Sequence, residues 1–209
     1  EPARVAQAVE QLKLRHAVIT SVTRDDLADG GASAFIETIQ AVRRSAPQVS
    51  IEVLIPDFLL NREALQDLVK ARPDIIGHNV ETVPGRFAQV RQGAQYRRSL
   101  RVLESIKEFH SQVYTKSGIM LGLGETEHEV EEVFKDLARV KCDFLSLGQY
   151  LAPSRSHEPV HEYLSPEQFQ HYKNSAYKCG FIFVASGPYV RSSYHAAEYL
   201  NRTAGSPKA

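Results

Sequence analysis

The chain has 209 residues, 43% of them hydrophobic and 24% charged, which suits one soluble domain with a substantial core. Lysine plus arginine equals aspartate plus glutamate, so the net charge of zero offers no electrostatic basis for binding nucleic acid or an anionic membrane. No apolar segment has the length of a membrane span, and we expect neither kind of partner. Cys142 and Cys179 lack metal-type spacing, which is typical of reduced thiols in a cytoplasmic protein.

Short β-rich segments alternate with amphipathic segments along the chain. Helices are predicted over 3–14, 32–44, 61–71, 96–110, 126–140 and 165–178. Strands are predicted over 16–22, 49–55, 74–80, 113–121, 143–147 and 181–185. Because the strands alternate with helices and no hairpin turn such as Asn-Gly occurs, the pattern predicts a parallel sheet with right-handed crossovers. Both a barrel and an open doubly wound sheet fit this pattern.

Polar residues follow each predicted strand, at the point where the chain leaves it. These segments are 20–31, 56–58, 78–83, 122–125, 148–154 and 187–195. The last of them, Gly-Pro-Tyr-Val-Arg-Ser-Ser-Tyr-His, would by itself be an ordinary solvated turn. Because the carboxyl ends of parallel strands lie at one edge, six such segments in succession favour a single lined cavity.

Individual motifs are weaker evidence than this arrangement. Gly122-x-Gly124 lacks the third glycine of a dinucleotide site, but it would let the backbone approach a ligand closely. Glu125 is either a ligand contact or a favourable charge near a helix N-terminus. Asn79 and Glu81, two residues apart in an extended segment, would point the same way and could bind a diol such as a ribose.

A series of motifs covering nearly the whole chain, in order, resembles lipoyl synthase, a radical S-adenosylmethionine (SAM) enzyme family. The matching runs are ITSVTRDDL with DGGA, IEVLIPDF, HNVETVP, YRRSL, TKSGIMLGLGET, LGQYLAPS and GPYVRSSYHA. The family carries two cysteine clusters and a first barrel strand upstream of these motifs, and none of them occurs in this sequence. We therefore expect this chain to be part of a longer protein and to be inactive alone.

The resemblance implies an incomplete parallel (β/α) barrel of the radical SAM type, an α/β fold. Residues 1–195 would form the barrel core and residues 196–209 a poorly ordered tail. Two [4Fe-4S] clusters, whose cysteine ligands are absent here, would serve with SAM as cofactors. One cluster would reduce SAM to a 5′-deoxyadenosyl radical, and the second would be consumed as the source of two sulfur atoms inserted at C6 and C8 of a protein-bound octanoyl chain.

The resemblance also implies the partners and a metal ligand. The octanoyl chain would be attached to a lysine of a lipoyl carrier domain or of H protein, and a ferredoxin or flavodoxin would supply electrons. The compartment would be the cytoplasm, or an organellar matrix or stroma in a eukaryote. By this resemblance Ser192, the serine after arginine in the last motif, would be a ligand of the second cluster, a role that suits an alkoxide because it is easily reprotonated and lost, and Arg191 would hold Ser192 or the substrate.

Strand-end position suggests the remaining site residues, all of them contacts of SAM. We expect Asn79 and Glu81 at the ribose, Lys116 at the methionyl carboxylate, Thr20 and Ser21 at the amino group, Gly122, Gly124 and Glu125 along the adenosine, and Gln149 and Tyr150 beside the adenine. Two alternatives are a barrel lyase or aldolase that uses Lys116 as a Schiff-base amine, and a cluster-free binder of lipoyl domains.

Overall fold

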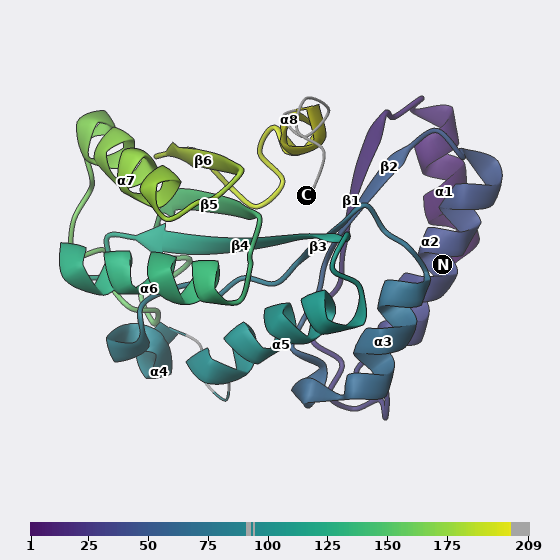
Figure 1. Ribbon diagram of the computed structural model, residues 1–209, viewed down its shortest axis with the longest axis horizontal. Coiled ribbons are helices and arrows are strands. Elements are labelled where there is room, and N and C mark those ends of the chain that lie inside the picture. The colour runs from purple at the N-terminus through teal and green to yellow at the C-terminus, as the bar shows by residue number, and fades with distance from the viewer. Residues whose placement is uncertain (91–92, 94, 202–209) are drawn as a thin grey trace.

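The computed structural model describes residues 1–90, 93 and 95–201. Its centre is one sheet of six parallel strands. The strands lie in the order in which they occur in the chain, so each pairs with the next one. The strands are β1 His16–Thr20, β2 Ser50–Leu54, β3 Ile75–Gly77, β4 Tyr114–Leu121, β5 Phe144–Gln149 and β6 Phe183–Gly187. The first and last strands do not pair with each other, so the sheet is curved but open (Figure 1). The predicted fold class, an incomplete parallel barrel, is confirmed.

The helices between the strands cover the outer face of this sheet (Figure 1). The α-helices of the described chain are α1 Pro2–Gln11, α2 Ala32–Ser45, α3 Arg62–Lys70, α4 Phe87–Val90, α5 Tyr96–Phe109, α6 Glu127–Arg139, α7 Pro166–Lys178 and α8 Ala196–Asn201, of which α8 lies on the inner face instead. Their starts follow the cap residues: the Asn61 side chain accepts a bond from Ala64 N, and Thr126 and Ser165 each begin a capping box. Predicted strand and helix positions agree with the structure to within a few residues at each end.

Two apolar clusters fix the sheet against its outer helices. One joins β1, β2 and β3 to α1, α2 and α3 through fully buried residues such as Ile39, Ile51 and Leu65. The other joins β4 and β5 to α6 and α7, with Phe134 and Leu145 at its centre. Each fully buried side chain of this size contributes roughly 1.5–3 kcal/mol. This packing makes the strands a rigid base for the loops at their carboxyl ends.

The inner face of the sheet carries a smaller cluster that includes α8. Phe144 and Phe183 contact the ring of Tyr199 edge-on, with centroid separations of 5.3 and 4.8 Å. Helix α8 lies between the two edge strands of the open sheet (Figure 1), and it contacts β1. In the tail that was predicted for 196–209, residues 196–201 form this helix, and residues 202–209 lie outside the described part. The sequence did not predict that Tyr199 is buried, because this tyrosine lies in a short polar segment.

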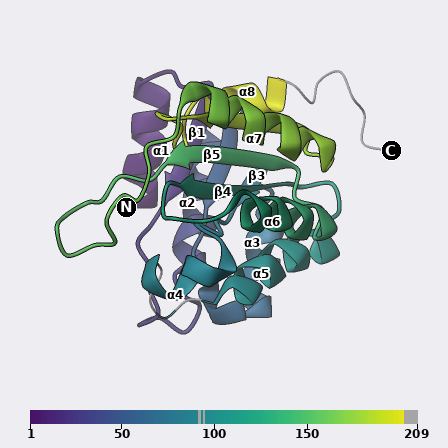
Figure 2. The same cartoon turned by 90° about the vertical axis from the view of Figure 1, so that its left-hand side faces the viewer.

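Two further local features, the short helix α4 and a 3-10 turn, were not predicted. The 3-10 turn, Phe58–Leu60, follows β2, and its three residues have φ between 47° and 59°. This left-handed backbone places the ring of Phe58 against Phe35, at 6.2 Å between centroids, and close to Gly30. The loop from β5 to α7, which the predicted strand and helix bounds imply, extends away from the sheet (Figure 2).

Candidate functional site

A cavity of about 170 Å³ lies at the carboxyl edge of β4 and β5. Three of the four chain segments that line it were predicted to hold site residues. The lining residues are Asn79, Glu81, Gly118, Ile119, Met120, Ser146, Gly148, Gln149, Leu151, Val190, Arg191 and Ser192. The structure therefore brings together five predicted site residues from three places in the sequence: Asn79, Glu81, Gln149, Arg191 and Ser192.

The inner wall of this cavity depends on a glycine. A methyl group built at Gly118 would lie 2.8 Å from both Asn79 Oδ1 and Ser146 Oγ. Non-bonded contacts this short do not occur at real Cβ atoms, so only glycine allows these two polar atoms to approach β4. Ser146, whose hydroxyl donates to Ser117 O, was not predicted from the sequence, because one serine inside an apolar strand carries no signal.

Asn79 and Glu81 are presented by a segment that leaves β3 and rejoins β4. Buried His78 anchors its start, with Nδ1 at 2.9 Å from Ile55 O and Nε2 at 3.0 Å from Ser99 Oγ. Glu81 then forms an isolated bridge with Ile119, through Glu81 N to Gly118 O and Met120 N to Glu81 O. The φ of Glu81 is +67°, an uncommon value for a residue with a side chain, and such values concentrate at functional sites.

Ser192 is held from two directions. Asn79 Nδ2 donates a 2.9 Å hydrogen bond to its hydroxyl oxygen, and Lys116 Nζ donates a 2.6 Å bond to its carbonyl oxygen. The neighbouring backbone lies against β5, since a methyl group at Gly148 would be 2.2 Å from Val190 O. Arg191 is exposed and donates to Val190 O at 2.7 Å. The chain after β6 is thus packed directly onto the cavity.

Lys116 lies deeper, inside the curve of the sheet. Its ammonium pairs with Glu52 Oε1 at 2.9 Å and lies 3.8 Å from the centre of the Tyr199 ring. Burial lowers the pKa of Lys116, and the attraction of Glu52 opposes that effect. The aldolase alternative requires an amine available to a carbonyl substrate, and these contacts engage it instead.

Thr20 and Ser21 lie in a different place. They line a separate cavity of about 320 Å³ beside β1, together with Ile19 and Val22. The Thr20 hydroxyl donates to Leu54 O at 3.1 Å, and the Ser21 hydroxyl donates to Val22 O at 2.9 Å. The structure does not bring these two residues to Asn79 and Glu81, and their contact with SAM stays a prediction.

The loop after β4 is organised by Glu125. Its carboxylate accepts hydrogen bonds from Gly122 N at 2.6 Å and from Leu123 N at 2.8 Å. Gly122 and Gly124 have φ values of +100° and +85°, and a methyl group at Gly122 would meet Glu162 O at 2.4 Å. These three predicted residues do not line the 170 Å³ cavity, and Glu125 here stabilises the loop itself.

Gln149 and Tyr150 connect that cavity with the loop between β5 and α7. The Gln149 amide donates to Glu162 O at 2.9 Å and accepts from Leu164 N at 3.0 Å, so it fixes the end of the loop. Tyr150 donates to Glu158 O and lines a neighbouring cavity of about 610 Å³. Burial raises the pKa of the Tyr150 hydroxyl. The two cavities share Met120 and Leu151.

The metal-binding capacity of the described residues is small. Residues 1–90, 93 and 95–201 contain no group of three or more His, Cys, Asp or Glu side chains that could hold a metal ion. Cys142 is buried and Cys179 follows α7, and neither lies at the cavity. The residues present therefore do not fit a complete iron–sulfur site. In the described part of the chain, no helix combines the length and the apolar character needed to cross a bilayer.

Comparison with known proteins decides the family. The Radical SAM superfamily matches residues 1–137. The lipoyl synthase of Caldanaerobacter subterraneus subsp. tengcongensis is 56% identical over 205 residues, which are 98% of this chain and 72% of that protein. The chain belongs to the lipoyl synthase family. It is also 58% identical to the lipoyl synthase of Geotalea daltonii and 61% identical to that of Geobacter sulfurreducens, over 95% of this chain and 67% and 65% of those proteins.

Membership of the family confirms the resemblance seen in the motifs. The protein is a radical SAM enzyme of the sulfur-inserting lipoyl synthase type, and this family uses SAM and [4Fe-4S] clusters and acts on octanoylated carrier proteins. Solved structures with low sequence identity share the fold. Methylornithine synthase covers all of this chain with a TM-score of 0.63 and 11% identity, over 73% of its own length. SuiB of Streptococcus suis bound to S-adenosylmethionine covers 93% with a TM-score of 0.68 and 9% identity, over 44% of its own length.

Proposed function

We propose that the cavity at the carboxyl ends of β4 and β5 is the SAM site of this lipoyl synthase and that Ser192 supplies one ligand of its second [4Fe-4S] cluster. The observation that carries the proposal is the convergence of Asn79, Glu81 and Ser192 on one small polar cavity from positions far apart in the chain. When bound, SAM and the two clusters supply the hydrogen-abstracting chemistry and the two sulfur atoms for C6 and C8 of the octanoyl chain.

The cavity fits part of such a cofactor. Asn79 offers an amide and Glu81 a carboxylate at the same wall, the combination that accepts and donates bonds to a pair of ribose hydroxyls. Gly118 leaves room beside the Asn79 side chain, where a Cβ atom would clash with it. The adjoining cavity of about 610 Å³ has a mixed lining, in which Met120, Tyr150 and Leu151 offer apolar surface to a planar base.

The chain's own residues then have separate tasks. The Asn79 amide donates a hydrogen bond to the Ser192 hydroxyl and would orient its oxygen as a ligand of the cluster. Arg191 lies beside Ser192 and is exposed, so its guanidinium is available to an anionic or carbonyl group of the substrate. We keep the proposed contacts of Thr20, Ser21, Gly122, Gly124 and Glu125 with SAM as predictions for the bound state.

The partners and compartment follow from the family. We propose that the electron donor is a ferredoxin or flavodoxin, and that the octanoyl chain arrives on a lipoyl domain or H protein rather than as a free acid. We propose the cytoplasm as the compartment, because the three relatives named above are bacterial enzymes and both cysteines are unpaired thiols. We further propose that two clusters are present in the whole protein.

The test is equilibrium dialysis of SAM against the whole protein, prepared without oxygen. We expect Asn79→Ala and Glu81→Ala each to weaken binding by about tenfold, the effect of losing one or two polar contacts worth 1–2 kcal/mol. Asn174→Ala and Glu167→Ala, on the exposed face of α7, are the matched controls and should not change the affinity. Unchanged affinity in both cavity variants would place SAM elsewhere.

A further inference from the structure

We infer that Lys116 is a positioning residue for the segment that carries Ser192, and that Glu52 holds Lys116 in that task. Lys116 projects from the middle of β4 into the curve of the sheet, and only 2% of its side chain is exposed. A buried ammonium is costly unless opposite charge and hydrogen-bond acceptors surround it, so its partners show what it is there to hold.

Glu52 supplies the charge. Its side chain, 1% exposed, comes from β2, two strands away, and its Oε1 accepts a 2.9 Å hydrogen bond from Lys116 Nζ. The other carboxylate oxygen lies 3.6 Å from Nε2 of His16 on β1. The Lys116–Glu52 pair therefore links the two halves of the open sheet through its interior. Glu52 holds the lysine side chain independently of the C-terminal segment.

The remaining contacts of Lys116 are both with that segment. Its Nζ donates a 2.6 Å hydrogen bond to the backbone carbonyl of Ser192 and lies 3.8 Å from the centre of the Tyr199 ring. A cation over an aromatic ring contributes attraction in addition to packing. One ammonium thus contacts both ends of the stretch from 192 to 199, while Asn79 contacts the Ser192 hydroxyl from the opposite side.

This arrangement assigns Lys116 a task different from binding the methionyl carboxylate of SAM. The ammonium group of Lys116 already contacts Glu52, Ser192 and Tyr199, and Lys116 does not line the cavity that we assign to SAM. The consequence for the reaction rests on the proposed role of Ser192. The contact between Lys116 and Ser192 does not depend on that role, because it is made to the backbone carbonyl of Ser192 and not to its hydroxyl.

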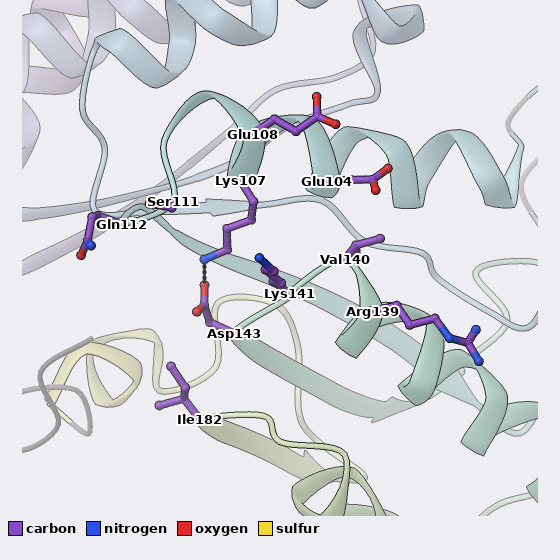
Figure 3. Close-up of a pocket in the computed structure, with 10 residues that line it drawn as sticks. All are labelled: Glu104, Lys107, Glu108, Ser111, Gln112, Arg139, Val140, Lys141, Asp143 and Ile182. Carbon is purple, nitrogen blue, oxygen red and sulfur yellow. Dashed lines mark hydrogen bonds and ion pairs between the residues drawn. The ribbon is translucent and has the colours of Figure 1, made fainter. Parts of the chain in front are cut away.

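Hydrogen exchange measured by mass spectrometry on the whole protein tests the inference. We expect Lys116→Met to accelerate amide exchange in the peptide covering 188–200 by about tenfold or more, while the peptides of β4 and β5 keep their protection. Glu52→Gln should accelerate the same peptide less, because the amide still accepts a bond from the lysine. Lys107→Met is the matched control, since Lys107 is another buried lysine paired with an acid, Asp143, but at the other end of the sheet (Figure 3).

Two further measurements keep the inference falsifiable. If Lys116→Met does not fold, the double variant Glu52→Gln with Lys116→Met, which leaves no buried charge in the pair, must show the same faster exchange in 188–200. Unchanged exchange of the 188–200 peptide in that variant would overturn the inference, and so would an equal acceleration in Lys107→Met. Unchanged exchange of this peptide in Lys116→Met together with a loss of SAM affinity would overturn it as well. These results are independent of the iron content on which the role of Ser192 depends.

Discussion

Asn79 and Ser192 are joined by a 2.9 Å hydrogen bond although 113 residues separate them in the chain. The amide of Asn79 donates and the serine hydroxyl accepts, so the bond leaves a lone pair of the hydroxyl oxygen for another partner. This contact connects the segment after β3, which we assign to SAM, with the segment after β6, which we assign to the second cluster. The account of the site depends on that connection.

Removing the amide should therefore loosen the cluster that Ser192 helps to hold. We expect Asn79→Ala to increase the rate at which a chelator removes iron from the anaerobic whole protein by about fivefold, because an oriented ligand loses a bond worth roughly 1 kcal/mol. Ser193→Ala, which changes the exposed hydroxyl of the next residue, should leave the rate unchanged. Equal rates in both variants would mean that the bond has no bearing on iron binding.

Gly118 should tolerate no side chain. Gly118→Ala would place a methyl group 2.8 Å from Asn79 and from Ser146, and relieving that clash should cost about 1–3 kcal/mol of folding free energy and displace Asn79. Denaturant unfolding and SAM dialysis measure the two effects. Gly77→Ala on β3 is the control, because its nearest neighbour would lie at an ordinary 3.4 Å. Normal SAM affinity in Gly118→Ala would show that this wall does not contact the cofactor.

Glu125 should prove important for stability. In Glu125→Ala the amides of Gly122 and Leu123 lose their carboxylate acceptor, and we expect the free energy of unfolding to fall by on the order of 2 kcal/mol. Glu127→Ala, two residues later, removes an exposed ion pair with His171 and should change it by less than about 0.5 kcal/mol. Similar losses in the two variants, measured by urea unfolding, would contradict the stabilising role of the Glu125 loop.

The buried Cys142 should make the free energy of unfolding depend on pH in the alkaline range. Burial raises the pKa of its thiol from an ordinary value of 9.0 to about 12. Between these values the unfolded chain releases the proton and the folded chain keeps it, so this contribution to stability is fully present below pH 9 and is lost as the pH rises toward 12. We expect the unfolding free energy to fall with pH more steeply in the wild type than in Cys142→Ala, by roughly 1 kcal/mol per pH unit.

The comparison for that prediction is urea unfolding between pH 9 and 10.5, where the other titrating groups cancel between the two proteins. Identical slopes would mean that the Cys142 thiol is accessible to solvent in the folded state.

The sequence predicted most of the fold because its signals are local. Alternating β-rich and amphipathic segments specify parallel strands and outer helices, and cap residues such as Asn61 and Thr126 mark helix starts within a residue. The turn at Phe58 could not be predicted, because its left-handed backbone is imposed by packing against Phe35 and Gly30. Tyr199 was missed for the same reason: a short polar segment does not reveal that its tyrosine enters the interior of the sheet.

The sequence also predicted which segments of the chain meet at the carboxyl edge of the sheet. Residues at strand ends, such as Asn79 and Ser192, do meet at one cavity, as the rule for parallel sheets requires. Lys116 did not follow the rule, because it lies in the middle of a strand and its partner Glu52 belongs to a strand that is not its neighbour. Pairings across the interior of a curved sheet depend on its curvature, which the sequence pattern does not specify.

The most direct test of the account is the iron and sulfide content of the whole protein, purified without oxygen, with Ser192 intact and with Ser192→Ala. We predict two clusters, about eight iron atoms per chain, in the intact protein, and loss of about half of that iron from the variant under mild chelation. Equal iron retention in the two proteins would contradict the assignment of Ser192 as a cluster ligand.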